Sequence, residues 1–333
     1  MDMIQDDPIL SVKNLRTELR LGSGTVEVVR GVSFSVKRGE TLGIVGESGS
    51  GKSMTALSIM RVLPRPIGRI AGGSIHLAGR DLVALTEAEM TRVRGREIGM
   101  ILQDPHTSLN PVYTVGNQVV EALELNRTEA RGGELLAKAI ALLKKVNVAD
   151  AERRVHAYPH QMSGGMKQRV VGAISIAGAP QVIIADEPTT ALDVTIQLQY
   201  LELLEQIQKD TGTAILFITH DLGIVARLCH RLVVMYAGRI VEEGRVDDVF
   251  DAPSHPYTVA LLNSVPHVDR KVDRLYAIEG QPPALHEIGE GCGFAPRCPF
   301  AEDRCRVSLP PSEPGRSGAP DHRSACWKIE ATA

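Results

Sequence analysis

The chain has 333 residues, of which 43% are hydrophobic and 23% charged, and its formal net charge is −3. This length exceeds what one hydrophobic core usually serves, so we expect a large domain with an inserted subdomain and an appendage. The balanced charge argues against nucleic acid as a partner. No stretch is apolar enough to span a bilayer, and the acidic start MDMIQDDP lacks the character of a secretory signal. We therefore expect a soluble, intracellular protein that can still dock on a membrane protein.

Residues 9–45 are typical of strands, and the segment LGSG at 21–24 predicts a hairpin turn between two of them. Residues 52–63 then show helical spacing that stops before Pro64, and residues 72–82 predict a second hairpin. The predicted early strands are 9–19, 25–36 and 41–45.

The middle of the chain predicts a helical insertion between about residues 114 and 155, where Leu135, Leu136, Ile140 and Leu143 lie on one helical face. Beyond it, two apolar runs bounded by polar residues predict strands buried on both faces. Strands that alternate with helices indicate a parallel α/β sheet. The later segments are the buried strands 181–186 and 213–220, a closing hairpin at 232–244, and an irregular or mobile Pro/Gly/Ser-rich link at 308–322.

A glycine-rich loop, GESGSGKS, directly follows the apolar run 41–45. It matches the spacing GxxxxGK followed by Ser or Thr, in which glycines let backbone N–H groups converge on phosphate at a helix N-terminus. A turn that binds nothing could share this composition, but the strand–helix setting favours a nucleotide site. Lys52 is predicted to reach the β- and γ-phosphates, and Ser53 to bind Mg²⁺. The predicted ATP-binding residues are Gly46, Glu47, Ser48, Gly49, Ser50, Gly51, Lys52 and Ser53.

A phosphate-binding loop requires a carboxylate for magnesium, and QVIIADEP supplies one at a strand end. Asp186 fits the metal-binding role, and Glu187 could polarise the attacking water. Acidic residues often end strands, so this pair indicates a magnesium site only because the chain also has a phosphate-binding loop. Gln103, after a short apolar run, could contact the metal or water, and His220 could hydrogen-bond the γ-phosphate.

A second glycine-rich helix start lies in HQMSGGMKQRV, at Ser163, Gly164, Gly165 and Met166. It has the features of another phosphate-binding helix N-terminus. One nucleotide in one loop does not need a second such site, so we expect this segment to face a nucleotide held by another subunit. A serine N-cap followed by flexible glycines is the competing interpretation.

The order of these motifs, followed by ALD at 191–193 and then His220, resembles the nucleotide-binding subunit of an ABC transporter. The resemblance implies a P-loop NTPase fold: an α/β, RecA-like parallel sheet core with an antiparallel β subdomain. It also implies that two cassettes close head-to-tail on two ATPs, with Ser163–Met166 and Asp193 facing the partner's nucleotide. Glu187 would be the general base, and His220 would orient the γ-phosphate and water. The implied domains are a nucleotide-binding domain at 1–250, with a helical subdomain inserted at about 105–160, and an extension at 251–333.

The chain resembles the ATPases of bacterial dipeptide and oligopeptide importers, a branch that includes nickel importers. The resemblance lies in the segments QDPHTSLNP, SGGMKQR, ADEPTTALDVTIQ and HPYT. The resemblance implies a peripheral position on the cytoplasmic face of the membrane. Implied partners are a second, related ATPase, two permease subunits and an extracytoplasmic solute-binding protein. A soluble ABC ATPase without a permease, or an importer of nickel or another solute, are the alternatives.

Two departures from the usual ABC pattern are visible. The first predicted strand offers Leu19 where many ABC domains stack an aromatic residue on adenine, so Val26 or Val28 would give only apolar contact. We therefore predict weak discrimination between purines. Met166 stands where the general signature has glutamine, and we expect activity to survive because Ser163 and backbone amides would be the phosphate donors.

The C-terminal part carries four of the five cysteines, Cys292, Cys298, Cys305 and Cys326. Four thiolates suit a [4Fe–4S] cluster or a structural zinc. The gaps are wider than the short pairs usual in zinc ribbons, and some dipeptide-importer ATPases are similar in carrying a cluster here, which favours iron–sulfur. Reduced cysteines in a packed tail remain an alternative. Cys229, in a helical pattern, is predicted to be a buried apolar residue.

Overall fold

The structure is a computed structural model that describes residues 7–22, 24–125, 132–190, 192–265 and 276–332. Parts of four sequence predictions lie outside these ranges: residues 1–6 of the acidic start, Ser23 of the predicted LGSG turn, residues 126–131 of the predicted insertion and Ala191 of the ALD segment. The chain divides into two compact units, which are described separately below. The first comprises residues 1–10, 36–40 and 84–217, and the second 11–35, 41–83 and 218–333. Within the described ranges, no helix combines the length and apolar character needed to cross a membrane.

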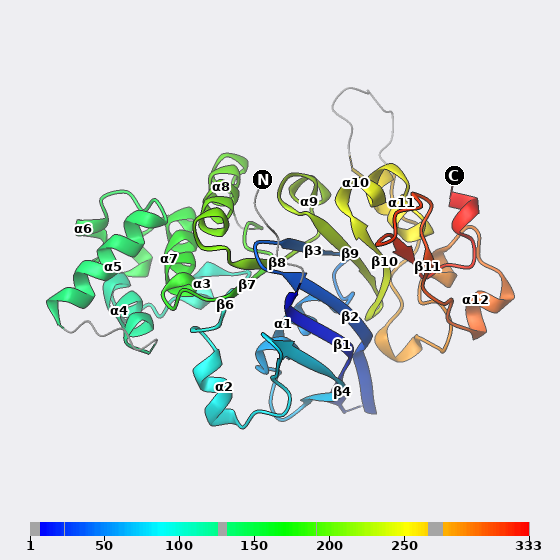
Figure 1. Ribbon diagram of the computed structural model, residues 1–333, viewed down its shortest axis with the longest axis horizontal. Helices are drawn as coiled ribbons and strands as arrows, with labels where there is room; N and C mark the ends of the chain where they lie inside the picture. Colours follow the sequence, from blue (N-terminus) through cyan, green and yellow to red (C-terminus); the bar gives the residue numbers. More distant parts are fainter. Residues whose placement is uncertain (1–6, 23, 126–131, 191, 266–275, 333) are drawn as a thin grey trace. The chain divides into compact units, whose positions relative to one another are not determined.

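The first unit combines short parallel strands with a group of helices (Figure 1). Strand β7 is buried at all five positions and pairs in parallel with β6, as the apolar run 181–186 predicted. The elements of this unit are α2 (Glu87–Val93), β6 (Ile98–Ile101), α3 (Pro105–Ser108), α4 (Val115–Leu125), α5 (Gly133–Lys145), α6 (Ala151–Arg154), η1 (Pro159–Gln161), α7 (Gly164–Ile176), β7 (Val182–Asp186), α8 (Val194–Thr211) and the first four residues of β8 (Ala214–Thr219).

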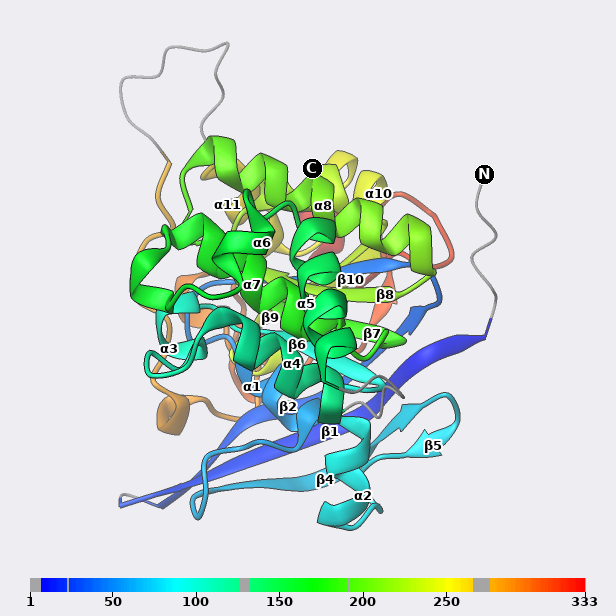
Figure 2. The ribbon, with the colours of Figure 1, turned by 90° about the vertical axis from the view of Figure 1, so that its left-hand side faces the viewer.

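Helices α4, α5 and α7 pack on one another within the first unit (Figure 2). Helix α5 buries Leu135, Ala139 and Leu143, whose spacing of four residues places them on one face. Leu136 and Ile140 are half-buried beside that face. The periodicity of the sequence therefore predicted this helix and its buried stripe correctly.

The second unit contains two sheets (Figure 1). One has the strand order β2-β1-β4-β5. In the other, β3 pairs in parallel with β9, while β10 pairs antiparallel with both β9 and β12, so the predicted parallel sheet is in fact mixed. The elements are β1 (Pro8–Leu21, mostly in this unit), β2 (Gly24–Lys37, likewise mostly in this unit), β3 (Thr41–Val45), α1 (Lys52–Met60), β4 (Gly68–Leu77), β5 (Arg80–Asp81), α9 (Leu222–Leu228), β9 (Arg231–Tyr236), β10 (Arg239–Arg245), α10 (Val246–Asp251), α11 (Pro256–Asn263), η2 (Leu285–Glu287), η3 (Ala295–Arg297), α12 (Asp303–Val307), β11 (Glu313–Pro314), β12 (Arg323–Ser324) and η4 (Ile329–Thr332).

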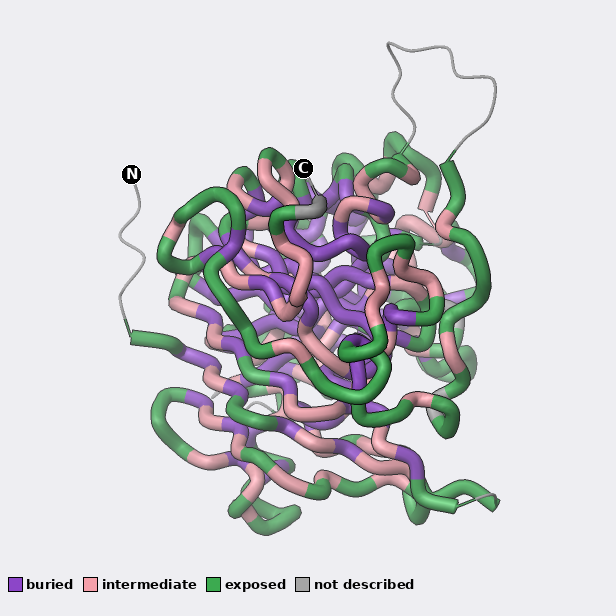
Figure 3. The backbone as a smooth tube through the Cα atoms, turned by 90° about the vertical axis from the view of Figure 1, so that its right-hand side faces the viewer, coloured by how far each residue is buried: buried purple, intermediate pink, exposed green. Residues whose placement is uncertain are grey.

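The C-terminal residues share a hydrophobic core with the strands of the second unit. Val45, the last residue of β3, belongs to the same buried cluster as Tyr236, Tyr257 and Phe294. The rings of Tyr236 and Tyr257 meet edge-on at 4.6 Å, and Phe294 lies 5.3 Å from each of them. Figure 3 shows the buried stretches of the chain in purple beneath exposed green loops. The core behind the glycine-rich loop is thus partly made of residues from far along the chain.

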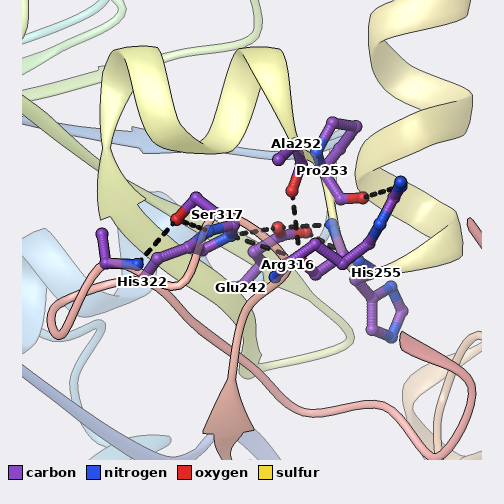
Figure 4. A network of polar contacts seen from close by, with 9 residues as sticks. Glu242, Ala252, Pro253, His255, Arg316, Ser317 and His322 are labelled. Carbon is purple, nitrogen blue, oxygen red and sulfur yellow. Dashed lines mark hydrogen bonds and ion pairs between the residues drawn. The ribbon is translucent and has the colours of Figure 1, made fainter. Parts of the chain in front are cut away.

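The segment 308–322 has little regular structure, as its composition predicted, but its end is firmly held rather than loose. His322 is completely buried, and its Nε2 lies 2.8 Å from Oε1 of Glu242, a residue of β10 (Figure 4). The Glu242 carboxylate also accepts hydrogen bonds from the backbone N–H groups of Ser254 and His255. A register shift between Ile240 and Glu242 marks a bulge, a device that re-aims side chains. Buried charge-assisted bonds of this kind fix the tail on β10.

Candidate nucleotide site and cysteine pocket

The glycine-rich loop joins β3 to α1 and has its shape imposed by crowding. Gly46 has φ +153°, and a Cβ there would lie 2.2 Å from the Met235 carbonyl oxygen. Gly51 has φ +100°, and a Cβ there would lie 2.8 Å from the Val28 carbonyl oxygen. Both positions therefore exclude a side chain for reasons of conformation and space. Ser48 and Gly49 form the exposed tip, where a ligand has access.

Lys52 is held against its own loop. Its Nζ donates hydrogen bonds to the carbonyl oxygens of Gly46 at 2.7 Å and Glu47 at 2.9 Å, and only 5% of the residue is exposed. Ser53, the predicted magnesium ligand, is half-buried in the first turn of α1. The Ser50 hydroxyl is buried and has no hydrogen-bond partner in the described part of the chain. This hydroxyl and the exposed loop tip can receive a polar ligand.

His220 follows β8 directly and is exposed, so its ring is accessible. The next residue, Asp221, caps α9 by accepting hydrogen bonds from the N–H groups of Gly223 and Ile224. The three residues predicted to lie near adenine come from β1 and β2. Val26 and Val28 are 8% and 3% exposed, so their side chains are part of the core, and Leu19 is half-buried. Because both valines are buried in the core, the structure does not support the predicted apolar contact between them and adenine.

In the first unit, the end of β7 brings two sequence-predicted residues together with a third. Asp186 closes the strand and is 6% exposed. Glu187 follows with φ +46°, an uncommon left-handed conformation for a non-glycine residue. Its Oε2 accepts hydrogen bonds from Gln103 Nε2 at 3.1 Å and from Thr190 Oγ1 at 3.0 Å. The carboxylate is thus oriented from two sides, as a general base requires.

The second glycine-rich segment begins α7. Ser163 is the N-cap, and its Oγ accepts a hydrogen bond from the Met166 N–H at 3.3 Å. A Cβ on Gly165 would lie 2.7 Å from Ile196 Cγ2 of α8, so packing of the two helices requires this glycine. A Cβ on Gly164 would meet nothing within 4 Å. Packing in the described chain therefore leaves Gly164 unexplained.

Asp193 is the N-cap of α8, where its Oδ1 accepts a hydrogen bond from the Ile196 N–H at 3.0 Å. This local task accounts for the residue type without any partner subunit. The capping interaction lies beside the Gly165–Ile196 contact, since Ile196 takes part in both. The starts of α7 and α8 therefore form one local structure.

The four C-terminal cysteines are all free thiols that line one small pocket. Burial raises the pKa of Cys292 and Cys298, and it raises that of Cys326 to about 11, with repulsion from the other thiolates adding to the effect. The pocket has a volume of about 20 Å³, little more than one water needs and too small for a four-iron cluster. Across the described residues, no three or more metal-binding side chains are arranged to hold an ion. The cysteines meet as expected, but in this structure they do not fit the cluster.

Cys229 is half-buried and packs against the core, close to the burial that the sequence predicted. Burial raises the pKa of its thiol strongly, because the charged form would lose its hydration. Its Sγ lies against β3, since a Cβ on Gly43 would be 3.0 Å from it. Cys229 therefore acts as a small apolar residue of the core, outside the C-terminal pocket.

Sequence reasoning missed several residues that contact the predicted site. Thr190 lies within ADEPTT, shortly after Asp186 and Glu187, and its position in that segment was the only signal. Tyr257 and Arg297 bind Glu47, from about 210 and 250 residues further along the chain. Local sequence patterns cannot predict contacts between residues so far apart in the chain.

Comparisons with known proteins agree with this geometry. A family model described as "ABC transporter" matches residues 29–190, and one described as "Oligopeptide/dipeptide transporter, C-terminal region" matches residues 241–305. The probable peptide ABC transporter ATP-binding protein y4tR of Sinorhizobium fredii is 50% identical over 97% of this chain and 95% of its own length. This chain belongs to the ATP-binding proteins of peptide and oligopeptide ABC importers.

Further members of the importer family extend the comparison. The oligopeptide transport ATP-binding protein AppD of Bacillus subtilis is 46% identical over 93% of this chain and 94% of its own. Among solved structures, a dimeric post-hydrolysis state of the ATP-binding cassette MJ0796, bound to ADP and Pi, has a TM-score of 0.64 at 27% identity. The similarity covers 71% of this chain and 98% of the MJ0796 chain. The α/β ABC cassette fold is therefore shared, and this chain carries additional residues.

Proposed function

We propose that this importer subunit hydrolyses ATP to drive the uptake of di- or oligopeptides through membrane permeases. The observation that carries the proposal is the oriented Glu187 carboxylate, bound by Gln103 and Thr190, in a chain with an intact glycine-rich loop. Its relatives are named as peptide and oligopeptide transport proteins. The C-terminal match to the oligopeptide/dipeptide family supports a peptide rather than another solute.

The proposed chemistry assigns the phosphates to residues 46–53, with Lys52 leaving its carbonyl partners for the β- and γ-oxygens. Ser53, Gln103 and Asp186 are the proposed ligands of Mg²⁺, which would neutralise charge on the phosphates. Glu187 would accept the proton of the attacking water, and His220 would orient the γ-phosphate. The accessibility of His220 and the hydrogen bonds of Glu187 support these roles.

The subunit is proposed to act as a dimer of cassettes in which Ser163–Met166 and Asp193 contact the ATP of the partner. The open space around Gly164 supports this, because a phosphate can approach the first N–H groups of α7 there. A related second ATPase and two permeases are the proposed partners, with a solute-binding protein delivering peptide outside. The subunit would then lie on the cytoplasmic face of the membrane.

We also keep metal binding by Cys292, Cys298, Cys305 and Cys326 as a proposal, with [4Fe–4S] preferred to zinc. Its support is that all four thiols line one pocket. Because that pocket holds little more than a water, the group would have to open it. Iron and acid-labile sulfide should be found in protein purified without oxygen. Colourless protein free of both iron and zinc contradicts this proposal.

Replacing Glu187 with glutamine tests the hydrolytic role. The amide keeps the shape but cannot take a proton, so the ATPase rate should fall about 10²–10⁴-fold while ATP still binds. ATP turnover and nucleotide retention measure the two effects. Glu202→Gln, an exposed acid of α8, is the matched control and should hydrolyse ATP normally. Undiminished hydrolysis by Glu187→Gln removes the general base from this scheme.

Co-purification distinguishes the importer from an ABC ATPase that has no permease. The tagged chain should retain two permease subunits through detergent purification from its native host. Peptide uptake by the reconstituted complex should then require ATP. A chain that purifies without permeases overturns the importer role. A complex that transports nickel but not peptides overturns the proposed solute.

A further inference from the structure

Glu47, the second residue of the glycine-rich loop, has each of its polar groups in a hydrogen bond. Its N–H donates to the Tyr257 hydroxyl at 2.8 Å, and its carbonyl oxygen accepts from Lys52 Nζ at 2.9 Å. Its carboxylate meets Arg297, with Nη1 to Oε2 at 2.7 Å and Nη2 to Oε1 at 3.2 Å. Two of these three partners come from the segment that matches the oligopeptide transporter C-terminal region.

Arg297 is itself fixed before it reaches the loop. Its side chain is only 5% exposed, and it donates to the Tyr236 hydroxyl at 3.1 Å and to the Glu279 carbonyl oxygen at 2.9 Å. Its guanidinium also lies 5.9 Å from the ring centres of Tyr236 and Phe294. A planar guanidinium held on several sides presents a rigid fork to a carboxylate, which a lysine cannot reproduce.

Tyr257 is equally well placed as a second support. The residue is fully buried, and burial strongly raises the pKa of its hydroxyl, which therefore stays protonated. Its helix, α11, begins at Pro256, and the N-cap residue His255 accepts a hydrogen bond from the Tyr257 N–H through Nδ1 at 3.1 Å. The contact with the Glu47 peptide is therefore made by a rigid element.

We infer that the C-terminal region braces the glycine-rich loop through Glu47, and that Arg297 and Tyr257 are positioning residues for ATP binding. A loop rich in glycine loses much backbone freedom when it closes on a ligand, and holding it in shape beforehand improves affinity. The inference rests on the proposed function, because it requires residues 46–53 to bind ATP.

Charge gives the brace a second, separable effect. Glu47 places a carboxylate within a loop proposed to receive a triphosphate, and Arg297 neutralises it. Without Arg297, the uncompensated carboxylate would repel the phosphates in a partly buried setting where screening is weak. Losing Arg297 should therefore harm ATP binding more than losing both charges together.

The experiment measures the dissociation constant of MgATP and the thermal midpoint of the full chain without nucleotide. Arg297→Gln should weaken binding about tenfold. Glu47→Gln combined with Arg297→Gln should recover part of that loss, because the repulsive carboxylate is gone. Arg297→Lys should fall between wild type and Arg297→Gln, since it keeps charge without the fork. It also keeps the test available should the glutamine variant fail to fold.

Arg304→Gln is the matched control, because Arg304 lies in the same region, pairs with Glu302 at 2.9 Å and covers the Trp327 ring at 5.0 Å. It should bind MgATP as wild type does. Equal affinity of wild type and Arg297→Gln overturns the brace while leaving the proposed function intact. An equal loss in Arg304→Gln also overturns it, because general loosening would then explain both. A wild-type chain that binds no ATP defeats the proposed function and this inference together.

Discussion

The chain contains two glycine-rich helix starts, the loop before α1 and the segment before α7, and they differ in what shapes them. Around the first, crowding excludes side chains at Gly46 and Gly51, and distant residues bind Glu47. Around the second, a serine cap and one helix contact account for Ser163 and Gly165, while Gly164 faces open space. Distant residues of its own unit shape the first start, whereas at the second the Met166 N–H is capped by Ser163 and a Cβ on Gly164 would meet only open space.

The largest expected effect separates the two glycine positions. Gly46→Ala puts a Cβ 2.2 Å from the Met235 carbonyl oxygen at a φ that only glycine adopts readily. The free energy of unfolding should therefore fall by about 3 kcal/mol or more. Gly164→Ala, with open space around its Cβ, should change it by no more than about 1 kcal/mol. Urea denaturation measures both, and equal losses would erase the distinction between the two starts.

A smaller effect concerns the support behind the first loop. Burial lowers the pKa of His255 to about 3, against 6.5 for the free side chain, so the folded chain binds fewer protons than the unfolded chain between these values. Stability should therefore be intact above pH 6.5 and fall by up to about 1.4 kcal/mol per pH unit below it. Urea denaturation between pH 4.5 and 7.5 measures the slope.

His255→Asn should flatten this dependence, because asparagine can cap α11 without titrating. Its stability at neutral pH is expected to be lower, since the ring packs near Phe294 at 6.0 Å. His286→Asn, at an exposed histidine, should leave the slope unchanged. An unaltered slope in His255→Asn would assign the acid sensitivity to other groups.

The smallest expected change in stability tests what Ser163 does. Ser163→Ala loses the cap of α7 and should cost about 1 kcal/mol, whereas Ser163→Asp keeps a capping oxygen and should cost little. Both should lose ATP-driven dimerisation in the Glu187→Gln background, the aspartate because its charge repels phosphate. Size-exclusion chromatography with ATP measures the dimer.

Thr86→Ala provides the control for Ser163, because Thr86 caps α2 through a capping box with Glu89. It should lose a similar amount of stability and still dimerise. If the Ser163→Asp chain dimerises as well as its Glu187→Gln parent, Ser163 only caps α7 and does not contact the ATP of the partner.

Several elements could be predicted from the sequence because their causes are local. The run 181–186 is apolar and short, and it forms the buried β7. The helix after the glycine-rich loop ends before Pro64, although it stops at Met60, where Arg61 adopts a left-handed conformation. The hairpin at 72–82 also forms, but β4 already begins at Gly68. Boundaries shifted because neighbouring strands extend or end an element as much as its own residues do.

By itself, the sequence determined the spacing of the glycine-rich loop, the polar residues that end β7, and the serine cap of α7, since each depends on neighbours a few residues away. Only the tertiary structure decided that Arg297 and Tyr257 hold Glu47, that His322 is buried on Glu242, and that the Met235 carbonyl excludes a side chain at Gly46. These contacts join residues separated by 80 to 250 positions. Such pairings follow from how strands and helices pack, and local periodicity carries no record of them.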